Sequence, residues 1–216
     1  MLVIIQARTS SKRFKNKILY RVYGKPLIQH VIEKIKKSKK VKIIVSTSIN
    51  KDDDKLVRFL IKKKINYYRG SLKNVAMRLY KTAVKEKQNF FLRISGDSPL
   101  IDYRIIDKII NIHEKNKNYD LITNIFPRTF PSGLSVEIIK TNTLGKSLKL
   151  FSKLDKEHVT RYFYRKSSEF KIKNFRNKKI NNFKKLSIDT LKELKMITKI
   201  FKKNKFITYS YLNEKN

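Results

Sequence analysis

Short apolar segments alternate with helix-like segments along the first part of the chain, and this alternation constrains the fold more than any other feature. The apolar segments carry β-branched and aromatic residues, and they are short and nearly continuous, as buried parallel strands are. They are LVIIQ (2–6), KIIVST (42–47), NYYRG (66–70), FFLRIS (90–95) and DLITN (120–124). Helical patterns fill the intervals at 26–38, 52–63, 74–87 and 103–115. Repeated β-α units of this length predict an α/β fold with a mostly parallel sheet and helices on both of its faces.

The pattern changes after residue 125. A proline-containing loop, FPRTFPSG, leads into a predicted strand, LSVEII (134–139). The remaining predicted elements are helices near 141–152 and 155–167, a strand near 170–175, a strand at 185–189 and a helix over 190–203. No internal repeat or linker separates these elements, and 216 residues suit one domain, so we expect a single domain over 1–216.

The composition excludes several classes of protein. The chain has no cysteine, so it cannot contain a disulfide scaffold, a thiolate metal site or a cysteine nucleophile. Its three histidines, His30, His113 and His158, match no zinc-binding spacing. No apolar run is long enough to span a bilayer, and Met1 leads directly into LVII with no basic segment before it. We therefore expect a cytoplasmic protein that does not contact a membrane.

The net charge is +36, because the chain has 53 lysines and arginines against 17 acidic residues. Such a charge meets the first requirement for a nucleic-acid-binding protein. The surplus is mostly lysine, however, and it is spread along the whole chain, whereas a specific binder gathers its basic residues on one face and favours arginine. We therefore interpret the charge as a solvated basic surface that attracts anionic substrates, without a specific nucleic-acid partner.

Ligands of open α/β sheets bind outside the carboxyl ends of the strands, so the loop after the first predicted strand is a candidate site. This loop, ARTSSKRFKNK (7–17), has three hydroxyl side chains and no glycine. Its cations are Arg8, Lys12, Arg13, Lys15 and Lys17. Cations and backbone N–H groups in a turn can hold a polyphosphate. The loop matches neither a Walker A loop nor a G-x-G-x-x-G motif, and from these residues alone a solvated turn is an equally good interpretation.

Two aspartates follow short apolar segments. Asp97, in SGDSPLID, comes directly after FFLRIS, and the preceding Gly96 allows a close turn of the backbone. Asp189, in LSIDTLKEL, precedes a predicted helix. Mg²⁺ takes one or two protein carboxylates together with substrate phosphates, so both aspartates are candidate ligands. The alternative is a helix cap or a turn residue, which is a strong alternative for Asp189 and fits Asp102 better than Asp97.

Other polar residues have structural interpretations. Three consecutive acids, at 52–54, lie where a helix is predicted to begin, and we interpret them as helix-start charges, with a simple cation site as the alternative. His30 lies in an amphipathic segment and is interpreted as structural. His113 lies near a predicted helix end, where it can interact with the helix dipole.

The motifs of the chain, taken in order, resemble those of one enzyme family. IIQARTSSKRFKNKIL followed by GKPLIQHVIEKI is similar to the opening of the sugar cytidylyltransferases, which include the acylneuraminate and 3-deoxy-manno-octulosonate cytidylyltransferases. Within them it is most similar to the branch named for spore coat polysaccharide biosynthesis protein F. The resemblance continues through IIVSTS, YRGSLKNVAMRLY, RISGDSPLID, TNIFPRTFPSGLSVEI, KEHVTRYF and LSIDTLKEL. It implies a three-layer α/β/α, Rossmann-like fold of the nucleotide-diphospho-sugar transferase type.

The resemblance also implies an activity. These enzymes transfer a cytidylyl group from CTP to an acidic or amino sugar, release pyrophosphate and use Mg²⁺. By resemblance, the triphosphate-binding residues are Arg8, Ser11, Arg13 and Lys17, and the metal-binding residues are Asp97 and Asp189. The acceptor oxygen is expected to attack the α-phosphorus in line, and the three cations are expected to act catalytically by stabilising the leaving pyrophosphate.

The remaining substrate contacts are implied by the same resemblance. The other nucleotide-binding residues are Arg69, Gly70, Ser71, Arg78 and Gly96. The acceptor-binding residues are Asn124, Pro131, Gly133, Glu137, Glu157 and His158. The family often forms dimers, so the resemblance is compatible with a homodimer.

The first loop departs from the family pattern, because a glycine and a Pro-Gly pair are replaced by Ser10, Lys15 and Asn16. This departure affects the geometry of the loop more than its charge. Three alternatives stay open at this point. They are a nucleotidyltransferase that uses another nucleotide or a phosphosugar, a basic nucleic-acid-binding protein without enzymatic activity, and an inactive relative that keeps the fold.

Overall fold

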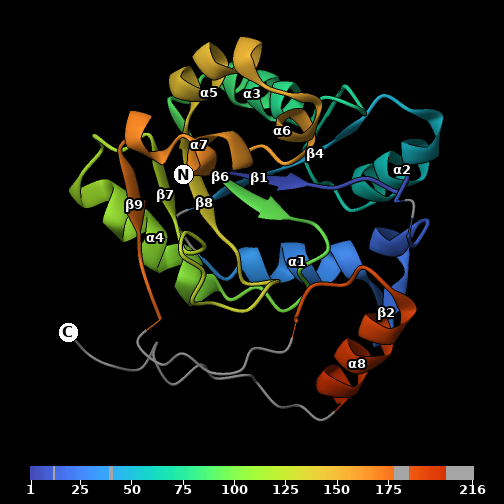
Figure 1. Ribbon diagram of the computed structural model, residues 1–216. Coiled ribbons are helices and arrows are strands. Elements are labelled where there is room, and N and C mark those ends of the chain that lie inside the picture. Colours follow the sequence, from blue (N-terminus) through green and yellow to red (C-terminus); the bar gives the residue numbers. More distant parts are fainter. Residues whose placement is uncertain (12, 39–40, 178–184, 203–216) are drawn as a thin grey trace.

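The structure is a computed structural model that describes residues 1–11, 13–38, 41–177 and 185–202. Lys12 of the first loop and the expected end of the last helix at Lys203 lie outside the described residues. The described residues form a seven-stranded sheet with helices on both faces, as the alternating pattern predicts (Figure 1). None of the described helices is long and apolar enough to cross a bilayer.

The strand order across the sheet is β5-β4-β1-β6-β8-β7-β9. The bounds are β1 Leu2–Gln6, β4 Lys42–Ser48, β5 Tyr67–Gly70, β6 Phe90–Ser95, β7 Leu121–Thr123, β8 Glu137–Lys140 and β9 Ile172–Asn174. Among these strands β8 alone runs antiparallel to its neighbours, so the sheet is mostly parallel. The carboxyl ends of β5, β4, β1 and β6 therefore lie at one edge, where a ligand site is expected.

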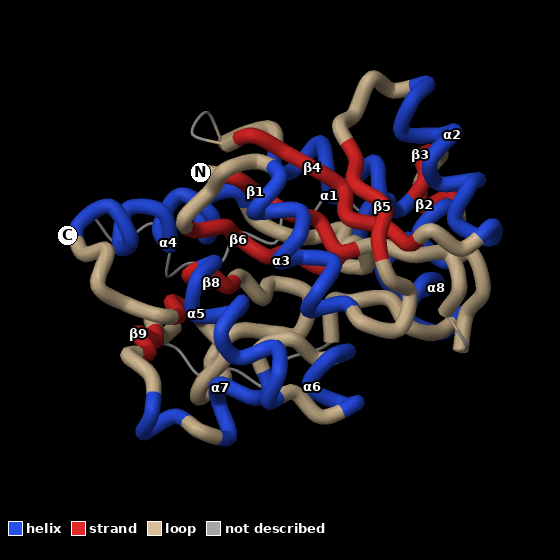
Figure 2. The backbone as a smooth tube through the Cα atoms, turned by 90° about the horizontal axis from the view of Figure 1, so that it is seen from above, coloured by secondary structure: helices blue, strands red, loops and turns tan. Residues whose placement is uncertain are grey.

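The side chains of β1 show why both faces of the sheet are covered. Val3 and Ile5 belong to one buried cluster, and Leu2 and Ile4 belong to another. The first cluster includes residues of α1 Leu27–Ile35, α2 Asp54–Lys62, α4 Tyr103–Lys115 and α8 Leu191–Lys202. The second includes residues of α3 Val75–Lys85, α5 Thr141–Ser147 and α7 Arg161–Arg165. Figures 1 and 2 show α3 and α5 on one side of the sheet and α1 and α4 on the other.

Shorter elements complete the described chain. The short helix α6 Lys153–Glu157 packs against α3. The 3-10 turns are η1 Lys17–Leu19, η2 Lys51–Asp53, η3 Leu148–Leu150 and η4 Ser167–Glu169. The strands β2 Arg21–Val22 and β3 Lys25–Pro26 form a small hairpin that the sequence analysis did not predict. Its two turn residues, Tyr23 and Gly24, both have positive φ, as a tight two-residue hairpin requires.

The predicted elements differ from the structure in three places. The predicted strand at 134–139 is paired only from Glu137 onward, as β8. The predicted helix at 155–167 is two short helices, because α6 ends at Glu157 and α7 begins at Arg161. The predicted strand at 185–189 is wrong. Its N–H groups bond to loop carbonyls, from Leu186 to Ser132 and from Ile188 to Asp97, so no strand ladder forms.

Asp102 and His30 have the structural roles that the sequence predicts, and His113 lies in the last turn of its helix. Asp102 caps α4 by accepting a hydrogen bond from the backbone N–H of Arg104. His30 is buried in α1 and its Nε2 lies 2.6 Å from the carbonyl oxygen of Val22. Burial is the main reason that the pKa of His30 is lowered. His113 is buried near the end of α4 and packs against the Phe90 ring.

Candidate active site

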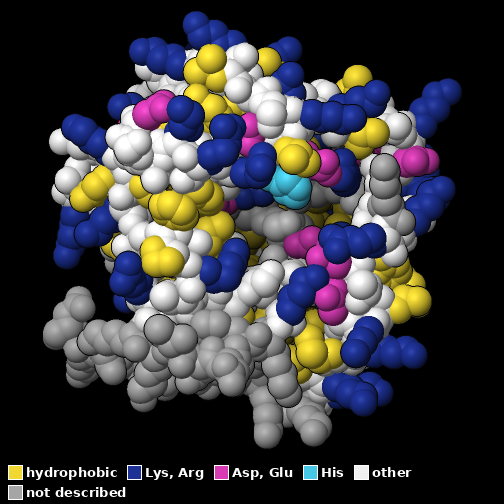
Figure 3. All heavy atoms as spheres, viewed as in Figure 1, with side chains coloured by type: hydrophobic (Ala, Val, Ile, Leu, Met, Phe, Trp, Pro, Cys, Tyr) yellow, Lys and Arg dark blue, Asp and Glu magenta, His cyan; other side chains and the backbone are white. Residues whose placement is uncertain are grey.

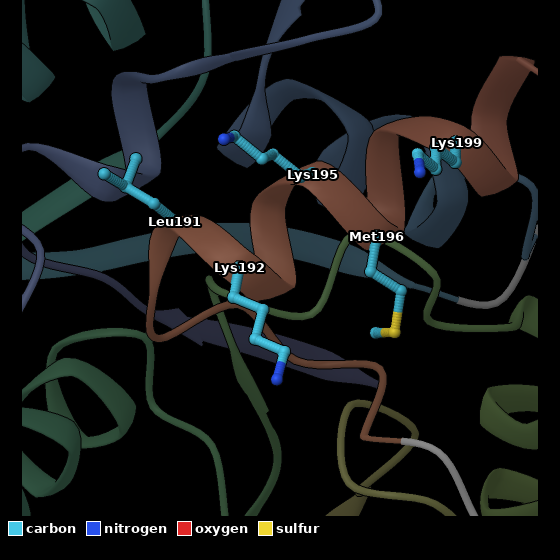
Figure 4. A pocket seen from close by; sticks show the side chains of 5 residues that line it. All are labelled: Leu191, Lys192, Lys195, Met196 and Lys199. Carbon is cyan, nitrogen blue, oxygen red and sulfur yellow. The ribbon is translucent and has the colours of Figure 1, made fainter.

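A hollow opens in the face of the molecule shown in Figure 3, over the end of β6. Acidic and basic side chains and a histidine surround this hollow. The described Lys and Arg side chains elsewhere on the same face are scattered over it. The hollow therefore lies at the carboxyl ends of the parallel strands, where their following loops begin. Both acidic and basic side chains surround it.

Lys17 joins two carboxylates at this edge of the sheet. Its Nζ donates hydrogen bonds to Asp97 Oδ2 at 2.7 Å, to Asp189 Oδ1 at 2.8 Å and to the carbonyl oxygen of Ile188 at 2.9 Å. The side chain of Lys17 is 9% exposed, whereas those of Asp97 and Asp189 are 21% and 18% exposed. The fold thus brings together three residues that the sequence analysis singled out, with the cation more deeply buried than the two carboxylates.

Asp97 is positioned by the close approach of the chain after β6 to the chain after β1. The N–H of Gly96 donates to the carbonyl oxygen of Gln6 at 2.8 Å. A Cβ atom on Gly96 would lie 2.9 Å from the Cβ atom of Ala7, which is too close. Glycine at this position therefore allows the contact that places Asp97 beside the first loop.

Asp189 is brought to Asp97 by the segment before α8. The N–H of Ile188, the residue before Asp189, donates to the carbonyl oxygen of Asp97 at 3.0 Å. This backbone hydrogen bond holds the two aspartates next to each other. Gly133 supports this segment, because its φ is +101° and an added Cβ would lie 2.5 Å from the carbonyl carbon of Leu186. Glycine is needed there for both its conformation and its size.

Asp189 is ionised at neutral pH. Burial by itself would raise its pKa, but hydrogen bonds and charges from Lys17 and Lys185 outweigh the burial and lower the pKa to about 2. Lys185 Nζ lies 2.7 Å from Asp189 Oδ2 and 2.8 Å from Glu193 Oε1. Arg13, whose side chain is 70% exposed, lies 3.4 Å from Asp189 Oδ1. Cations therefore surround this carboxylate.

The first loop is built around Thr9. The carbonyl oxygen of Thr9 accepts hydrogen bonds from the N–H of Ser11 at 2.9 Å and of Asn16 at 2.8 Å. Asn16 has φ 60° and ψ 15°, a left-handed conformation that asparagine tolerates better than most residues. Asparagine can therefore take the place of a glycine here. Ser10, at another departure from the family, has a buried Oγ without a hydrogen-bond partner among the described residues.

Four of the predicted nucleotide-binding residues, Arg69, Gly70, Ser71 and Arg78, lie between the end of β5 and the first turns of α3. Arg69 Nε donates to the carbonyl oxygen of Ser48 at 3.0 Å, and its Nη2 lies 2.7 Å from Asp54 Oδ1. Gly70 lies against Arg78, because an added Cβ would be 2.9 Å from Arg78 Cγ. Arg78 is 1% exposed and donates to the carbonyl oxygen of Ser71 at 2.7 Å. The segment therefore forms one packed unit.

Arg78 has hydrogen-bond donors that no described residue of this unit uses. Its Nε and Nη2 are buried and have no hydrogen-bond partner among the described residues. Burial, together with the charge of Arg8, lowers its pKa to about 10, and the charge of Asp53 opposes this change. A buried cation with unused donors is a suitable partner for an anion or a carbonyl oxygen of a ligand.

Three of the predicted acceptor-binding residues are buried in the loop between β7 and β8. The side chain of Asn124 bonds to the carbonyl oxygen of Leu134 at 2.8 Å and to the N–H of Val136 at 3.0 Å. Pro131 and Gly133 are buried in the same loop. Their described contacts are with the protein, so contact with a sugar stays a prediction for all three.

Glu137 is the centre of a buried polar network on β8. It is 1% exposed, pairs with Arg93 on β6 and accepts a hydrogen bond from Tyr164 Oη at 2.5 Å. Arg93 also donates to Gln6 Oε1 at 3.0 Å. Burial and the neighbouring Glu137 raise the pKa of Tyr164, so its hydroxyl stays protonated. The network connects the end of β1 to α7.

Arg8, predicted to bind the triphosphate, and Glu157, predicted to bind the acceptor, form an ion pair. Arg8 Nη2 lies 2.7 Å from Glu157 Oε1, and the two side chains are 33% and 47% exposed. Next to Glu157, His158 lines an open pocket of about 440 Å³. The other lining residues are Arg93, Ile125, Thr160, Arg161, Tyr164 and Arg165. The predicted phosphate loop and the predicted acceptor region therefore meet at this ion pair.

The donor set at Lys17 can accept a divalent cation together with a substrate. Two ionisable carboxylates converge on one point, and both are accessible. The described residues contain no group of three or more acidic or histidine side chains able to hold a metal by themselves. Mg²⁺ commonly uses one or two carboxylates and completes its coordination with phosphate oxygens and water, so the residues present fit this metal.

Several residues at this edge were missed by the sequence analysis. Arg93 lies within a strand and Tyr164 within a helix, and neither position signals a functional contact. Lys185 is one of many lysines in the chain. Asp53 was interpreted as a helix-start charge, and its complete burial and its bond to Thr9 were not anticipated.

Comparison with known proteins identifies similar chains. A sequence model of the family described as cytidylyltransferase matches residues 2–215. An uncharacterized protein of Methanocaldococcus jannaschii is 37% identical over 171 residues, which cover 78% of this chain and 69% of that protein. Spore coat polysaccharide biosynthesis protein SpsF of Bacillus subtilis is 28% identical over 170 residues, which cover 75% of this chain and 69% of that protein.

A solved structure agrees with these matches. The structure of a cytidylyltransferase from Leptospira borgpetersenii has a TM-score of 0.85 and 25% sequence identity to this chain. The match covers 100% of this chain and 98% of that chain. The similarity thus extends over the sheet, the helices and the segments that deliver Lys17, Asp97 and Asp189.

Proposed function

The chain belongs to the cytidylyltransferase family, and on that premise we propose that it transfers the cytidylyl group of CTP to a hydroxyl of a sugar acid or amino sugar and releases pyrophosphate. The similarity to a protein named for polysaccharide biosynthesis supports a role in making cell-surface polysaccharide or glycan. A nucleotide-sugar precursor for such a polymer is a reasonable product of this reaction.

The observation that carries the proposal is the convergence of Lys17, Asp97 and Asp189 at the carboxyl edge of the sheet. Asp97 and Asp189 would hold Mg²⁺ when CTP is bound. The metal would neutralise phosphate charge and make the attacking oxygen more acidic. Lys17 would then turn from the carboxylates to the phosphates. Its ammonium group has three N–H donors, too few to hydrogen-bond fully with both the carboxylates and the phosphates at the same time.

The first loop would bind the leaving pyrophosphate. Arg13 is mostly exposed beside Asp189, and Arg8 lies near the start of the loop, where it pairs with Glu157. Fixed cations aimed at developing negative charge lower the barrier because they need no reorganisation during the reaction. Ser11 and the backbone N–H groups of the loop would complete the phosphate contacts.

The pocket lined by His158 is our proposed acceptor site. Arg161 and Arg165 are about half exposed there, while the carboxylate that pairs with both, Asp155, is 0% exposed. The pocket therefore presents guanidinium groups, which suit a carboxylate or several hydroxyl oxygens. Glu157 would contact the sugar after Arg8 turns to the nucleotide.

Two further features of the proposal concern partners and place in the cell. We propose that CTP and the sugar are the ligands, with a homodimer as the assembly and the cytoplasm as the location. A nucleic-acid partner is not favoured, because the family match supports another function.

The test is pyrophosphate release from CTP with a panel of acceptor sugars. The panel contains 3-deoxy-manno-octulosonate, N-acetylneuraminate and neutral and amino hexoses, each assayed with CTP, UTP, ATP or GTP and with or without Mg²⁺. We expect release only with CTP, Mg²⁺ and one acceptor class. Release with another nucleotide in preference to CTP would contradict the proposal.

A further inference from the structure

Asp53 is a buried acid close to the first loop, and the proposed reaction leaves it without a role. Its side chain is 0% exposed, which is rare for an aspartate unless it has strong partners. It ends η2, just before α2, and this position alone is explained by a favourable charge at a helix start. That explanation does not require burial, because Asp52 at the same helix start is exposed.

The partners of Asp53 lie on two different segments. Oδ1 accepts a hydrogen bond from the backbone N–H of Thr9 at 2.6 Å and lies 2.8 Å from the Thr9 hydroxyl. Oδ2 accepts from the hydroxyl of Ser48 and from its N–H at 3.3 Å. The carboxylate thus bridges the end of β4 to the first loop, 44 positions away in the chain.

Thr9 connects Asp53 to the rest of the loop through its own hydrogen bonds. Its hydroxyl also lies 2.7 Å from the carbonyl oxygen of Asp52, and its side chain is 0% exposed. Its own carbonyl oxygen accepts the N–H groups of Ser11 and Asn16. Arg8 precedes Thr9 and Lys17 follows Asn16, so the hydrogen bonds of Thr9 lie between these two cations.

The loop needs such an anchor because its sequence does little to restrict its shape. It contains no proline between residues 7 and 17. Proline would restrict the backbone before folding, and without it the shape must come from tertiary contacts. A carboxylate that accepts hydrogen bonds from a backbone N–H and a hydroxyl is a strong contact of this kind.

We propose that Asp53 is a positioning residue for the triphosphate: acting through Thr9, it holds the first loop in the shape that presents Arg8, Arg13 and Lys17 to the phosphates. The inference rests on the proposed function for the identity of the nucleotide. The class of ligand positioned, an oligophosphate, follows from the cations of the loop.

The experiment compares Asp53→Asn with Asp52→Asn. Both variants remove one negative charge at the same helix start, but only Asp53 contacts Thr9 through its side chain. Asparagine keeps an oxygen for Thr9 and turns an N–H₂ group toward the donors of Ser48. Equilibrium binding of CTP and of inorganic tripolyphosphate is measured by calorimetry below the unfolding transition, together with the melting temperature and steady-state kinetics.

We expect Asp53→Asn to weaken binding of both ligands about tenfold and to raise the KM for CTP, whereas Asp52→Asn binds as the unaltered protein does. Thr9→Val removes only the hydroxyl and is expected to act in the same direction, and Thr9→Ser is expected to restore binding. If Asp53→Asn does not fold, the Thr9 pair decides the question.

A purely structural role gives a different result. In Asp53→Asn the melting temperature and the active fraction would fall. The KM for CTP and the dissociation constants of the folded protein would stay unchanged. This result would overturn the inference. Failure of the proposed function is distinguishable. The unaltered protein would then bind tripolyphosphate without preferring CTP, and weaker tripolyphosphate binding by Asp53→Asn would still support the positioning role.

Discussion

The two halves of the candidate site use ion pairs in opposite orientations. On the side of Lys17 the cation is nearly buried, and the carboxylates of Asp97 and Asp189 are the more exposed partners. On the side of α7 the carboxylate of Asp155 is completely buried, and Arg161 and Arg165 are the exposed partners. Relative to the partner they share, one half therefore offers carboxylates to a ligand and the other offers guanidinium groups, while Arg13 and Lys185 also lie beside Asp189.

This difference teaches that burial decides which member of an ion pair is available to a ligand. A net charge of +36 suggests an indiscriminate attraction for anions. The partly accessible carboxylates of the first half instead suit a divalent cation that accompanies phosphates. The exposed guanidinium groups of the second half suit an anionic or hydroxyl-rich acceptor.

The largest effect is expected from Asp97→Asn, which removes a carboxylate from the half that offers carboxylates. Mg²⁺-dependent turnover should fall about a thousandfold or more, because metal stabilisation of the transition state amounts to several kcal/mol. The measurement is pyrophosphate release as Mg²⁺ is varied. Asp102→Asn in the same segment is the control, because Asp102 caps α4. Turnover equal to that of the unaltered protein would remove Asp97 from the metal site.

Lys17→Met tests the buried cation of the same half. We expect kcat to fall by about 10²–10³, the usual cost of losing a fixed donor at a developing charge. Without Lys17 the two carboxylates also lose their shared partner, so Mg²⁺ should bind more tightly in the absence of nucleotide. Mn²⁺ binding followed by electron paramagnetic resonance measures this directly. Lys15→Met, an exposed lysine of the same loop, should change neither quantity.

Arg161→Gln tests the half that offers guanidinium groups. Arg165 still neutralises Asp155 in this variant, so the fold should be retained. We expect the KM for the acceptor to rise about tenfold, the loss of one charge-assisted hydrogen bond, while the KM for CTP stays constant. Arg58→Gln, at an exposed position on α2, is the matched control. A parallel rise in the KM for CTP would show that the two halves are not separate subsites.

The smallest effect is the pH dependence that Asp189 gives to stability. Its pKa in the folded protein is about 2, below the ordinary value of 3.8. The folded state therefore binds this proton less tightly than the unfolded state does. The stabilisation is complete above about pH 4 and is lost as the pH falls toward 2. Urea unfolding across this range should show a shallower decline in Asp189→Asn than in the unaltered protein, and identical slopes would contradict the assignment.

The sequence predicts the parallel part of the fold well because local signals agree there. The apolar periodicity of 103–115 and the capping residue Asp102 predict α4 at its observed bounds. Lys17, Asp97 and Asp189 could be predicted as neighbours because each lies in a segment that follows an apolar run and resembles a family motif, and the structure places the three side chains together. The helix cap proposed as the alternative for Asp97 is found at Asp102 instead.

Other features depend on contacts that no local pattern encodes. The segment at 185–189 has the composition of a strand, but its neighbours are two separate loops, so its backbone bonds do not form a ladder. The position of Asp53 at a helix start already explains an acidic residue there, so the sequence gives no sign of its hydrogen bond to Thr9. The burial of Asp155 and Glu137 could not be inferred either, because it depends on how α7 and β8 pack against the rest of the chain.

The most direct test of the contrast between the two halves is thermal unfolding with CTP, UTP, ATP and GTP, each with and without Mg²⁺, at moderate salt. A ligand at about 100 times its Kd stabilises a fold by about 2.7 kcal/mol, which raises the melting temperature by a few degrees. If the partly accessible carboxylates hold a metal beside the nucleotide, CTP with Mg²⁺ should raise the melting temperature more than any other combination. Equal shifts for all four nucleotides that ignore Mg²⁺ and disappear with salt would show a polycation without a nucleotide site, and would contradict the account.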